Sequence, residues 1–163
     1  MQAAANAIAR RRHRIQFLIA GPPGTGKTRT LTAAVMATLH CQSFASILLC
    51  APSNTAADTL ALRLTAALRP GQMLRINDPG RTFAELPEAL GPFCHVQEAG
   101  DGGSSFGLPP WKKLMAARVV VGECRRSGRS AVADSHETQP PPMMCPCCSA
   151  VAARATQISV AWM

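Results

Sequence analysis

Eight consecutive residues of this chain have the types and the spacing needed to bind the phosphates of a nucleotide. Residues 21–28 read GPPGTGKT and fit the pattern G-x-x-x-x-G-K-[ST] at every defined position. The glycines let the backbone bend until several N–H groups point at one anion, and a helix that starts at Lys27 would add the positive end of its dipole. The pattern predicts an ATP-binding loop. We expect the nucleotide to contact Gly21, Pro22, Pro23, Gly24, Thr25, Gly26, Lys27, Thr28 and Arg29.

Within this loop, Lys27 and Thr28 are the residues expected to take part in catalysis. Lys27 would reach the β- and γ-phosphates as a point charge, and the Thr28 hydroxyl would bind the Mg²⁺ ion that bridges the same oxygens. Pro22 and Pro23 would stiffen the loop. The alternative is an ordinary Gly/Pro turn between a strand and a helix. It is disfavoured because an apolar run, Ile15–Ala20, precedes the loop and a helical pattern follows it, as the phosphate-binding motif requires.

The elements around the loop alternate between strand and helix. Apolar residues near helical spacing predict helices over 27–40 and 55–68, and an alanine-rich start predicts another over residues 1–12. Short continuous apolar runs predict buried parallel strands at 15–20, 46–51, 73–76 and 118–121. We therefore expect an α/β fold of the P-loop NTPase class. It would be a partial RecA-like parallel sheet with helices on both faces and the ligand at the carboxyl ends of the strands, followed by an irregular tail.

The last part of the chain lacks such a pattern. Glu98–Pro110 has the composition of a loop, and beyond about Cys124 the sustained apolar period ends. We expect a partial ATP-binding domain over residues 1–124 and a low-complexity, disordered tail over 125–163. The cysteine cluster at 145–148, with His136 upstream, suggests a zinc site as an alternative. Zinc sites normally need two spaced ligand pairs, and this sequence has no second pair, so the disordered tail is the preferred interpretation.

Composition limits the class of protein further. A length of 163 residues suits one domain, and a formal net charge of +8 is typical of surfaces that bind polyanions. The basic run Arg10–Arg14 is expected to be a solvated stretch, with nucleic-acid contact as the second interpretation. No apolar stretch of about 18 residues is present, so no membrane partner is expected. Seven cysteines at irregular spacing favour reduced thiols and a cytoplasmic protein, with the nucleus as the alternative.

A second segment narrows the class of nucleotide-binding protein. Leu49–Asp58, which reads LCAPSNTAAD, resembles motif Ia of superfamily 1 helicases. Gln2 stands where these helicases keep a glutamine that reads adenine. Together with residues 21–28, these features make the chain similar to the first RecA-like domain of the up-frameshift-type group, nearest to the Armitage-like RNA-silencing helicases. The similarity runs from Gln2 to Cys124, and it is less specific over residues 74–81, 86–88 and 92–94.

The resemblance implies that single-stranded RNA or DNA binds at Ser53 and Asn54, and that RNA-silencing or RNA-decay proteins are partners. A physical argument agrees, because a hydroxyl and an amide at the carboxyl end of a strand suit phosphate oxygens. A plain helix N-cap at Ser53, Asn54 or Thr55 is the structural alternative, and it is compatible with nucleic-acid binding.

The sequence also departs from the helicase pattern. An acidic pair that holds magnesium, and a second RecA-like domain that supplies arginine fingers, are not visible in it. Gly122 and Glu123 stand where the family has a threonine-containing motif, and Glu123 is expected to be a helix cap or an exposed turn residue rather than a degenerate acidic motif. We therefore expect a truncated helicase fragment that is inactive by itself. The alternatives are an AAA+-type or other P-loop ATPase that does not act on nucleic acid, and a dead adaptor fragment.

Overall fold

The computed structural model describes residues 6, 19–98, 103–123 and 156–159. Gln2, the basic run at 10–14 and the cysteine cluster at 145–148 lie outside these residues. So do the predicted helix at 1–12, except Asn6, and most of the predicted strand at 15–20, of which residues 19 and 20 are described as irregular.

A parallel sheet of four strands forms the centre of the described fold, in the order β2-β5-β1-β6. Its strands are β1 (Ile47–Ala51), β2 (Met73–Ile76), β5 (Val119–Glu123) and β6 (Thr156–Ser159). Strand β1 lies between β5 and β6, with Leu49 opposite Val121 on one side and opposite Ile158 on the other. Because every pair is parallel, all strands end at the same edge of the sheet.

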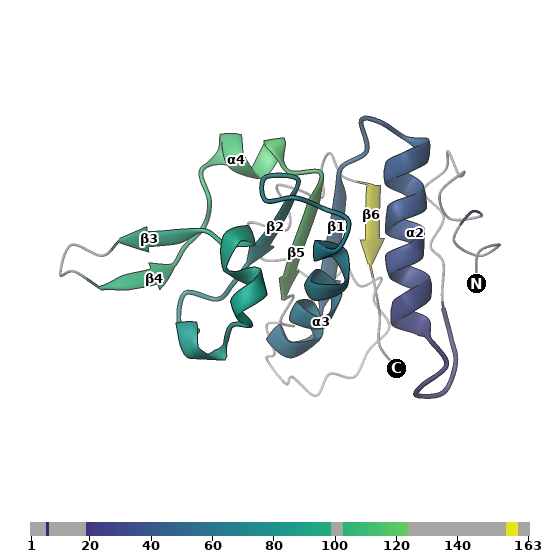
Figure 1. The fold of residues 1–163 in the computed structure, drawn as a ribbon, viewed down its shortest axis with the longest axis horizontal. Helices are drawn as coiled ribbons and strands as arrows, with labels where there is room; N and C mark the ends of the chain where they lie inside the picture. Colours follow the sequence, from purple (N-terminus) through teal and green to yellow (C-terminus); the bar gives the residue numbers. More distant parts are fainter. Residues whose placement is uncertain (1–5, 7–18, 99–102, 124–155, 160–163) are drawn as a thin grey trace, which may run out of the picture.

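Helices α2 (Lys27–Cys41) and α3 (Asn54–Thr65) share a core with one face of this sheet (Figure 1). On the opposite face, Leu48, Leu74 and Val120 are also buried, which explains why these strands are continuous apolar runs. The fold class predicted from the sequence, a parallel α/β sheet flanked by helices, is confirmed. The shared core consists of Leu31, Val35, Leu39, Ile47, Leu49, Ala51, Ala57, Leu60, Ala61, Leu64, Leu68, Met73, Leu90, Phe93, Val119 and Val121.

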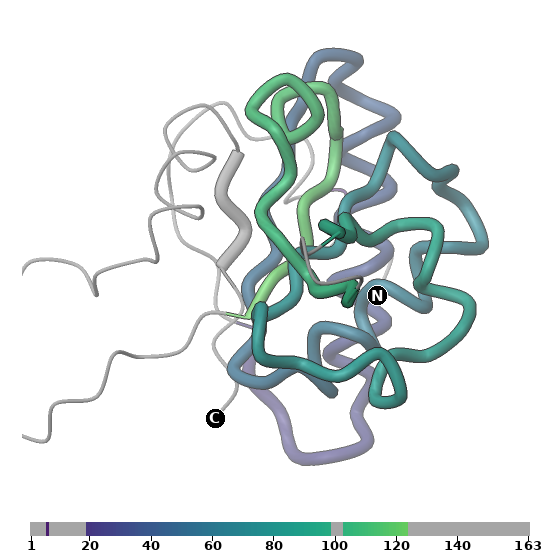
Figure 2. The backbone as a smooth tube through the Cα atoms, turned by 90° about the vertical axis from the view of Figure 1, so that its left-hand side faces the viewer, coloured from purple at the N-terminus to yellow at the C-terminus, as the bar shows by residue number. Residues whose placement is uncertain are grey.

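The segment between β2 and β5 is more ordered than its composition indicates. It contains two 3₁₀ helices, η1 (Phe83–Glu85) and η2 (Glu88–Phe93), and the short helix α4 (Trp111–Ala116). It also contains an antiparallel pair, β3 (Val96–Glu98) and β4 (Ser104–Phe106). Figure 1 shows this pair and α2 at opposite ends of the described part, and Figure 2 views the chain from the side of the pair.

The prediction of a loop over Glu98–Pro110 is therefore wrong at Glu98 and at β4. Local composition missed the pair because its order comes from cross-strand pairing and from a contact outside it. Phe106 is 1% exposed and packs on Phe83, with ring centroids 4.4 Å apart and ring planes tilted by 43°. Such a contact between distant residues leaves no trace in a glycine-rich segment of sequence.

The segment predicted to be an irregular tail contains strand β6, which lies beside β1. Backbone pairing with a neighbouring strand creates this element, and a local pattern does not reveal such pairing. Residues 124–155 and 160–163 lie outside the described part, and their disorder stays a prediction. No helix in the described part of the chain is long and apolar enough to cross a membrane.

Candidate nucleotide-binding loop and nucleic-acid interface

The predicted phosphate-binding loop lies directly before α2, at the edge of the sheet where the strands end (Figure 1). Its bend depends on glycine. Gly24 and Gly26 have φ angles of +81° and +86°, a region that residues with a Cβ atom rarely adopt. A Cβ atom at Gly21 would lie 2.9 Å from Thr25 Oγ1, so a larger residue there would displace the Thr25 side chain that braces the loop. The glycine spacing of the sequence motif thus corresponds to real backbone constraints.

Side chains inside the loop hold its shape. Thr25 Oγ1 donates to the carbonyl oxygen of Pro22 at 2.8 Å. Lys27 Nζ donates to the carbonyl oxygens of Gly21 and Pro22, the second at 2.9 Å. Lys27 is the first residue of α2, so its ammonium group reaches back across the loop that precedes it. This places a positive charge inside the bend that the glycines create.

The amino end of α2 is open to an anion. Its N-cap is Gly26, which supplies no side-chain hydrogen bond, and the first turn contains no acidic residue. The first backbone hydrogen bond of the helix runs from Thr30 N to Gly26 O at 2.9 Å, so the N–H groups before Thr30 receive no helical partner. With the dipole of a 15-residue helix behind them, these donors suit a phosphate group.

The donor set also fits a magnesium nucleotide. Thr28, in the first turn of α2, offers a hydroxyl oxygen and is partly buried. Among the described residues there is no cluster of three or more His, Cys, Asp or Glu side chains that could hold a metal ion. Mg²⁺ commonly keeps several water ligands and binds through one or two protein groups and the phosphates of its nucleotide, so a single hydroxyl is compatible with it. Arg29, the last predicted contact residue, is exposed.

The second predicted site lies at the start of α3, where β1 ends. Ser53 has an extended backbone, and its hydroxyl accepts a hydrogen bond from Ala56 N at 3.2 Å. Ser53 is therefore the N-cap of α3, one of the three residues that the structural alternative named for this role. Its side chain is exposed, so the cap leaves it accessible to a ligand.

Asn54, the first residue of α3, accepts two hydrogen bonds from Arg75, which lies in strand β2. Arg75 Nη2 donates to Asn54 Oδ1 at 2.9 Å and to the Asn54 carbonyl oxygen at 3.3 Å. Arg75 lies in β2 and is only 1% exposed. The predicted nucleic-acid residue is thus tied to a buried charge on the sheet.

Asp58 holds two guanidinium groups at once. Its Oδ1 accepts from Arg75 Nε at 2.9 Å and from Arg81 Nη1 at 3.1 Å, and its Oδ2 accepts from Arg81 Nη2 at 2.5 Å. Arg81 also donates to Asn77 Oδ1 at 2.9 Å and to the carbonyl oxygen of Glu85 at 2.8 Å. We call Asn54, Asp58, Arg75 and Arg81 the buried polar network. It joins α3 to β2 and to the loop that follows β2.

The surroundings shift the pKa values of three side chains in this region. Burial lowers the pKa of Arg75, and the nearby Asp58 carboxylate opposes that shift. The hydrogen bond to Asp58 raises the pKa of Arg81. Burial raises the pKa of the Cys94 thiol, which accepts from Asn77 Nδ2 at 3.1 Å. Cys94 is thus a neutral, buried side chain at the border of the network.

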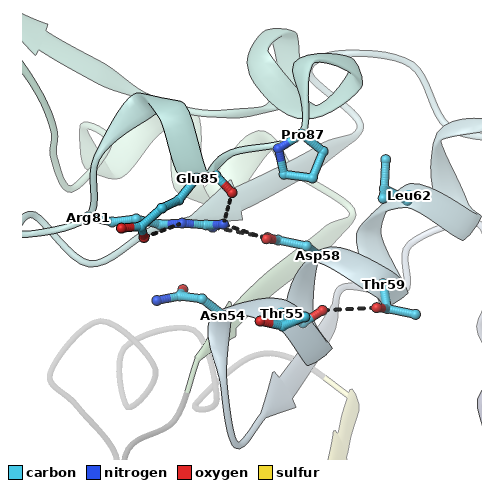
Figure 3. A pocket seen from close by; sticks show the side chains of 8 residues that line it. All are labelled: Asn54, Thr55, Asp58, Thr59, Leu62, Arg81, Glu85 and Pro87. Carbon is cyan, nitrogen blue, oxygen red and sulfur yellow. Dashed lines mark hydrogen bonds and ion pairs between the residues drawn. The ribbon is translucent and has the colours of Figure 1, made fainter.

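Two open cavities flank Asn54. The larger, about 500 Å³, is lined by Asn54, Thr55, Asp58, Thr59, Leu62, Arg81, Glu85 and Pro87 (Figure 3). The smaller, about 310 Å³, is lined by Asn54, Asp78, Gly80, Arg81 and Glu85. Both involve the first turns of α3, the Arg81 loop and η1. The structure thus places one of the two predicted nucleic-acid residues beside solvent-accessible space.

Residue spacing alone does not reveal a role for Asp58, Arg75, Arg81 or Glu85. One signal was present, because Arg75 interrupts the otherwise apolar run Met73–Ile76. A charged residue in a buried strand needs a partner, and Asp58 is that partner.

Glu123 is the last residue of β5 and pairs in register with Ala51. The expectation that it caps a helix or lies in an exposed turn is wrong. Strand β5 continues to Glu123 because β1 extends equally far beside it, and the side chain is partly buried. The acidic group therefore stands at the edge of the sheet where the strands end.

Comparison with known proteins identifies the family. A family model described as AAA domain matches residues 1–96, more than half of the 163 residues. The chain is 39% identical over 116 residues to the RNA helicase Mov10l1 of Mus musculus, which covers 70% of this chain and 9% of the relative. It is 36% identical over 113 residues to MOV-10 of Gallus gallus, covering 69% and 11%. For armi of Drosophila melanogaster the identity is 32% over 93 residues, covering 55% and 8%.

The chain thus spans about a tenth of the length of these relatives. No solved structure gives a significant match. The family match and the relatives agree with the two sequence segments that the structure places at one edge of the sheet. The chain belongs to the AAA domain family and, within it, to the superfamily 1 helicases of the Armitage-like type, of which it covers a part.

Proposed function

We propose that this chain is the ATP·Mg-binding part of an ATP-dependent helicase that moves along single-stranded RNA or DNA. The observation that carries the proposal is the loop at 21–28. Its positive φ angles, its inward Lys27 ammonium and the uncapped helix behind it together suit the phosphates of a nucleotide. Helicase relatives support the nucleic-acid part of the proposal.

Each residue of the loop would have a distinct task. Lys27 would exchange its contacts with the carbonyl oxygens of Gly21 and Pro22 for the terminal phosphates of ATP. The Thr28 hydroxyl would bind Mg²⁺, which neutralises developing charge on those phosphates when it is bound. Arg29 is exposed beside the loop and would add a positive charge to its rim. Gln2 would contact the adenine, as the family resemblance implies.

The second site would bind the nucleic-acid backbone at the start of α3. Ser53 and Asn54 offer a hydroxyl and an amide there, close to the cavities that Asn54 lines. Contacts to the phosphate backbone position a strand without reading its sequence, which suits a protein that moves along it. We propose that partners of the complete protein are RNA-silencing or RNA-decay proteins, and that it acts in the cytoplasm.

The isolated chain should hydrolyse ATP slowly or not at all. In helicases of two RecA-like domains, ATP closes the cleft between them and hydrolysis reopens it, so movement depends on both domains. Loss of arginine fingers costs on the order of 10³ or more in turnover in related phosphate-loop enzymes. We therefore expect nucleotide binding with no unwinding.

Calorimetric titration of Mg·ATP into the whole chain tests the nucleotide site. The wild type should release heat on binding, Lys27→Ala should not, and the control Lys112→Ala, in α4 on the opposite edge of the sheet, should behave as the wild type. Absence of heat with the folded wild type would refute the proposal. A separate titration with a labelled single-stranded oligonucleotide distinguishes a helicase part from a P-loop ATPase that ignores nucleic acid, or from an adaptor without a ligand.

A further inference from the structure

We infer that Arg75 is a positioning residue that holds Asn54 as an outward-facing hydrogen-bond donor for a phosphodiester oxygen of single-stranded nucleic acid. The inference rests on the proposed function and assigns a role to a side chain that is too deeply buried to touch a ligand. Its basis is the direction of the hydrogen bonds between the two residues.

Hydrogen-bond chemistry determines which atom of the Asn54 amide faces inward. A guanidinium group has donors and no acceptor, so the amide atom 2.9 Å from Arg75 Nη2 must be the oxygen. The same Nη2 donates to the Asn54 carbonyl oxygen at 3.3 Å, which ties the side chain and the backbone to one point. The remaining polar atom of the side chain is Nδ2, which can only donate.

Arg75 can impose this orientation because its own position is held from several sides. Its Nε donates to Asp58 Oδ1 at 2.9 Å, and its Nη1 donates to the carbonyl oxygen of Ile76. Asp58 lies four residues after Asn54 in α3, on the same side of the helix. Arg75 therefore bridges two positions of α3 from a site that is 1% exposed.

The Nδ2 donor belongs to a residue that borders the two open cavities. Asn54 lines both of them, and Figure 3 shows its amide nitrogen directed away from helix α3. Within the described part of the chain, Nδ2 has no hydrogen-bond partner. A group that can only donate cannot bind a metal cation, but it suits an oxygen that carries negative charge.

The carboxylates around these cavities are largely compensated. Asp58 is paired with Arg75 and Arg81, and Glu85 lies 3.9 Å from Arg81 Nε with its side chain 64% exposed. Asp78 accepts from Gly80 N at 2.8 Å. If the Asn54 amide turned its oxygen outward, it would add another hydrogen-bond acceptor beside these carboxylates. The bond from Arg75 prevents that orientation.

Asn54→Asp is the most direct test, because it keeps an oxygen for Arg75 and replaces the outward donor with a carboxylate oxygen. We expect its affinity for a fluorescein-labelled oligouridine or oligothymidine, measured by anisotropy, to fall by more than about tenfold, and that of Asn54→Ala by about tenfold. Thermal unfolding of Asn54→Asp should be unchanged or shifted upward, since every buried charge keeps its partner. Unchanged oligonucleotide affinity in Asn54→Asp would overturn the inference.

A double-mutant cycle tests whether Arg75 acts through Asn54. Arg75→Met should weaken oligonucleotide binding by about tenfold in the wild type and by less than about twofold in Asn54→Ala. A merely structural role would lower affinity equally in both backgrounds and would overturn the inference. The control Arg69→Met removes an exposed charge just before β2 and should leave affinity within about twofold of the wild type.

Failure of the inference is distinguishable from failure of the proposed function. If the folded wild type binds neither oligonucleotide, the proposed nucleic-acid function is wrong and the inference falls with it. If the wild type binds and Asn54→Asp binds equally well, only the role of Arg75 and Asn54 is wrong. Asn54→Asp keeps this test decisive even if Arg75→Met does not fold.

Discussion

Arg75 and Asp58 form an ion pair whose side chains are 0% and 7% exposed, and this pair connects β2 to α3. Arg81 shares the same carboxylate at 2.5 Å. One negative charge therefore compensates two guanidinium groups in the interior. The stability of this arrangement depends strongly on the Asp58 carboxylate, because an unpaired charge in the interior costs far more free energy than an exposed one.

Asp58→Asn should destabilise the fold by about 3–5 kcal/mol, because it leaves buried Arg75 without its carboxylate partner and Arg81 with only the exposed Glu85. Urea unfolding followed by circular dichroism measures this change. The control is Glu85→Gln, which removes an exposed partner of Arg81 and should cost less than about 1 kcal/mol. Equal stability of the two variants would show that the buried polar network contributes nothing to folding.

Gly24→Ala should weaken Mg·ATP binding by about tenfold, since a Cβ atom disfavours the φ angle of +81° by about 1–2 kcal/mol. The loop is exposed, so global unfolding should change little. Gly91→Ala is a matched control, because a Cβ atom there meets no neighbour within 4 Å and the backbone has no positive φ. Calorimetry in which both variants bind like the wild type would contradict the geometric role of Gly24.

Thr28→Val should remove the dependence of ATP binding on magnesium. Removing Mg²⁺ with a chelator is expected to weaken binding by the wild type, and to have little effect on a variant that lacks the hydroxyl ligand. Thr32→Val, one turn further along α2, removes a hydroxyl that donates to the carbonyl oxygen of Arg29 and serves as the control. If Thr28→Val keeps the full magnesium effect, the metal is bound by other groups.

Cys94 should make the fold less stable at alkaline pH. Burial raises the pKa of this thiol above its ordinary value of 9.0, so the unfolded chain loses the proton first as the pH rises. The folded state then holds more protons than the unfolded state, and the free energy of unfolding falls with increasing pH. Urea unfolding between about pH 8 and about pH 10 should show a steeper loss in the wild type than in Cys94→Ala. Parallel pH profiles would contradict this assignment.

Much of the fold and part of the site were predictable from local sequence. The helix after the glycine-containing loop at 21–28 was expected over 27–40 and extends over 27–41, and the strand at 73–76 was predicted with its observed bounds. These elements depend on apolar spacing and on breaking residues, which act within a few positions of the chain. The glycines at 24 and 26 and the Ser53 cap were predictable for the same reason.

The sequence by itself thus determined the glycine bend at 21–28, the helix behind it and the capped start of α3, because each results from interactions between close neighbours. Only the tertiary structure decided the strand order, the β3–β4 pair and the partners of Asn54. Arg75 and Asp58 are 17 residues apart, and Arg81 and Asp58 are 23 residues apart. Charges so far apart in the chain meet only when the packing of α3 on the parallel sheet brings them together. No local pattern of residues specifies such a long-range contact.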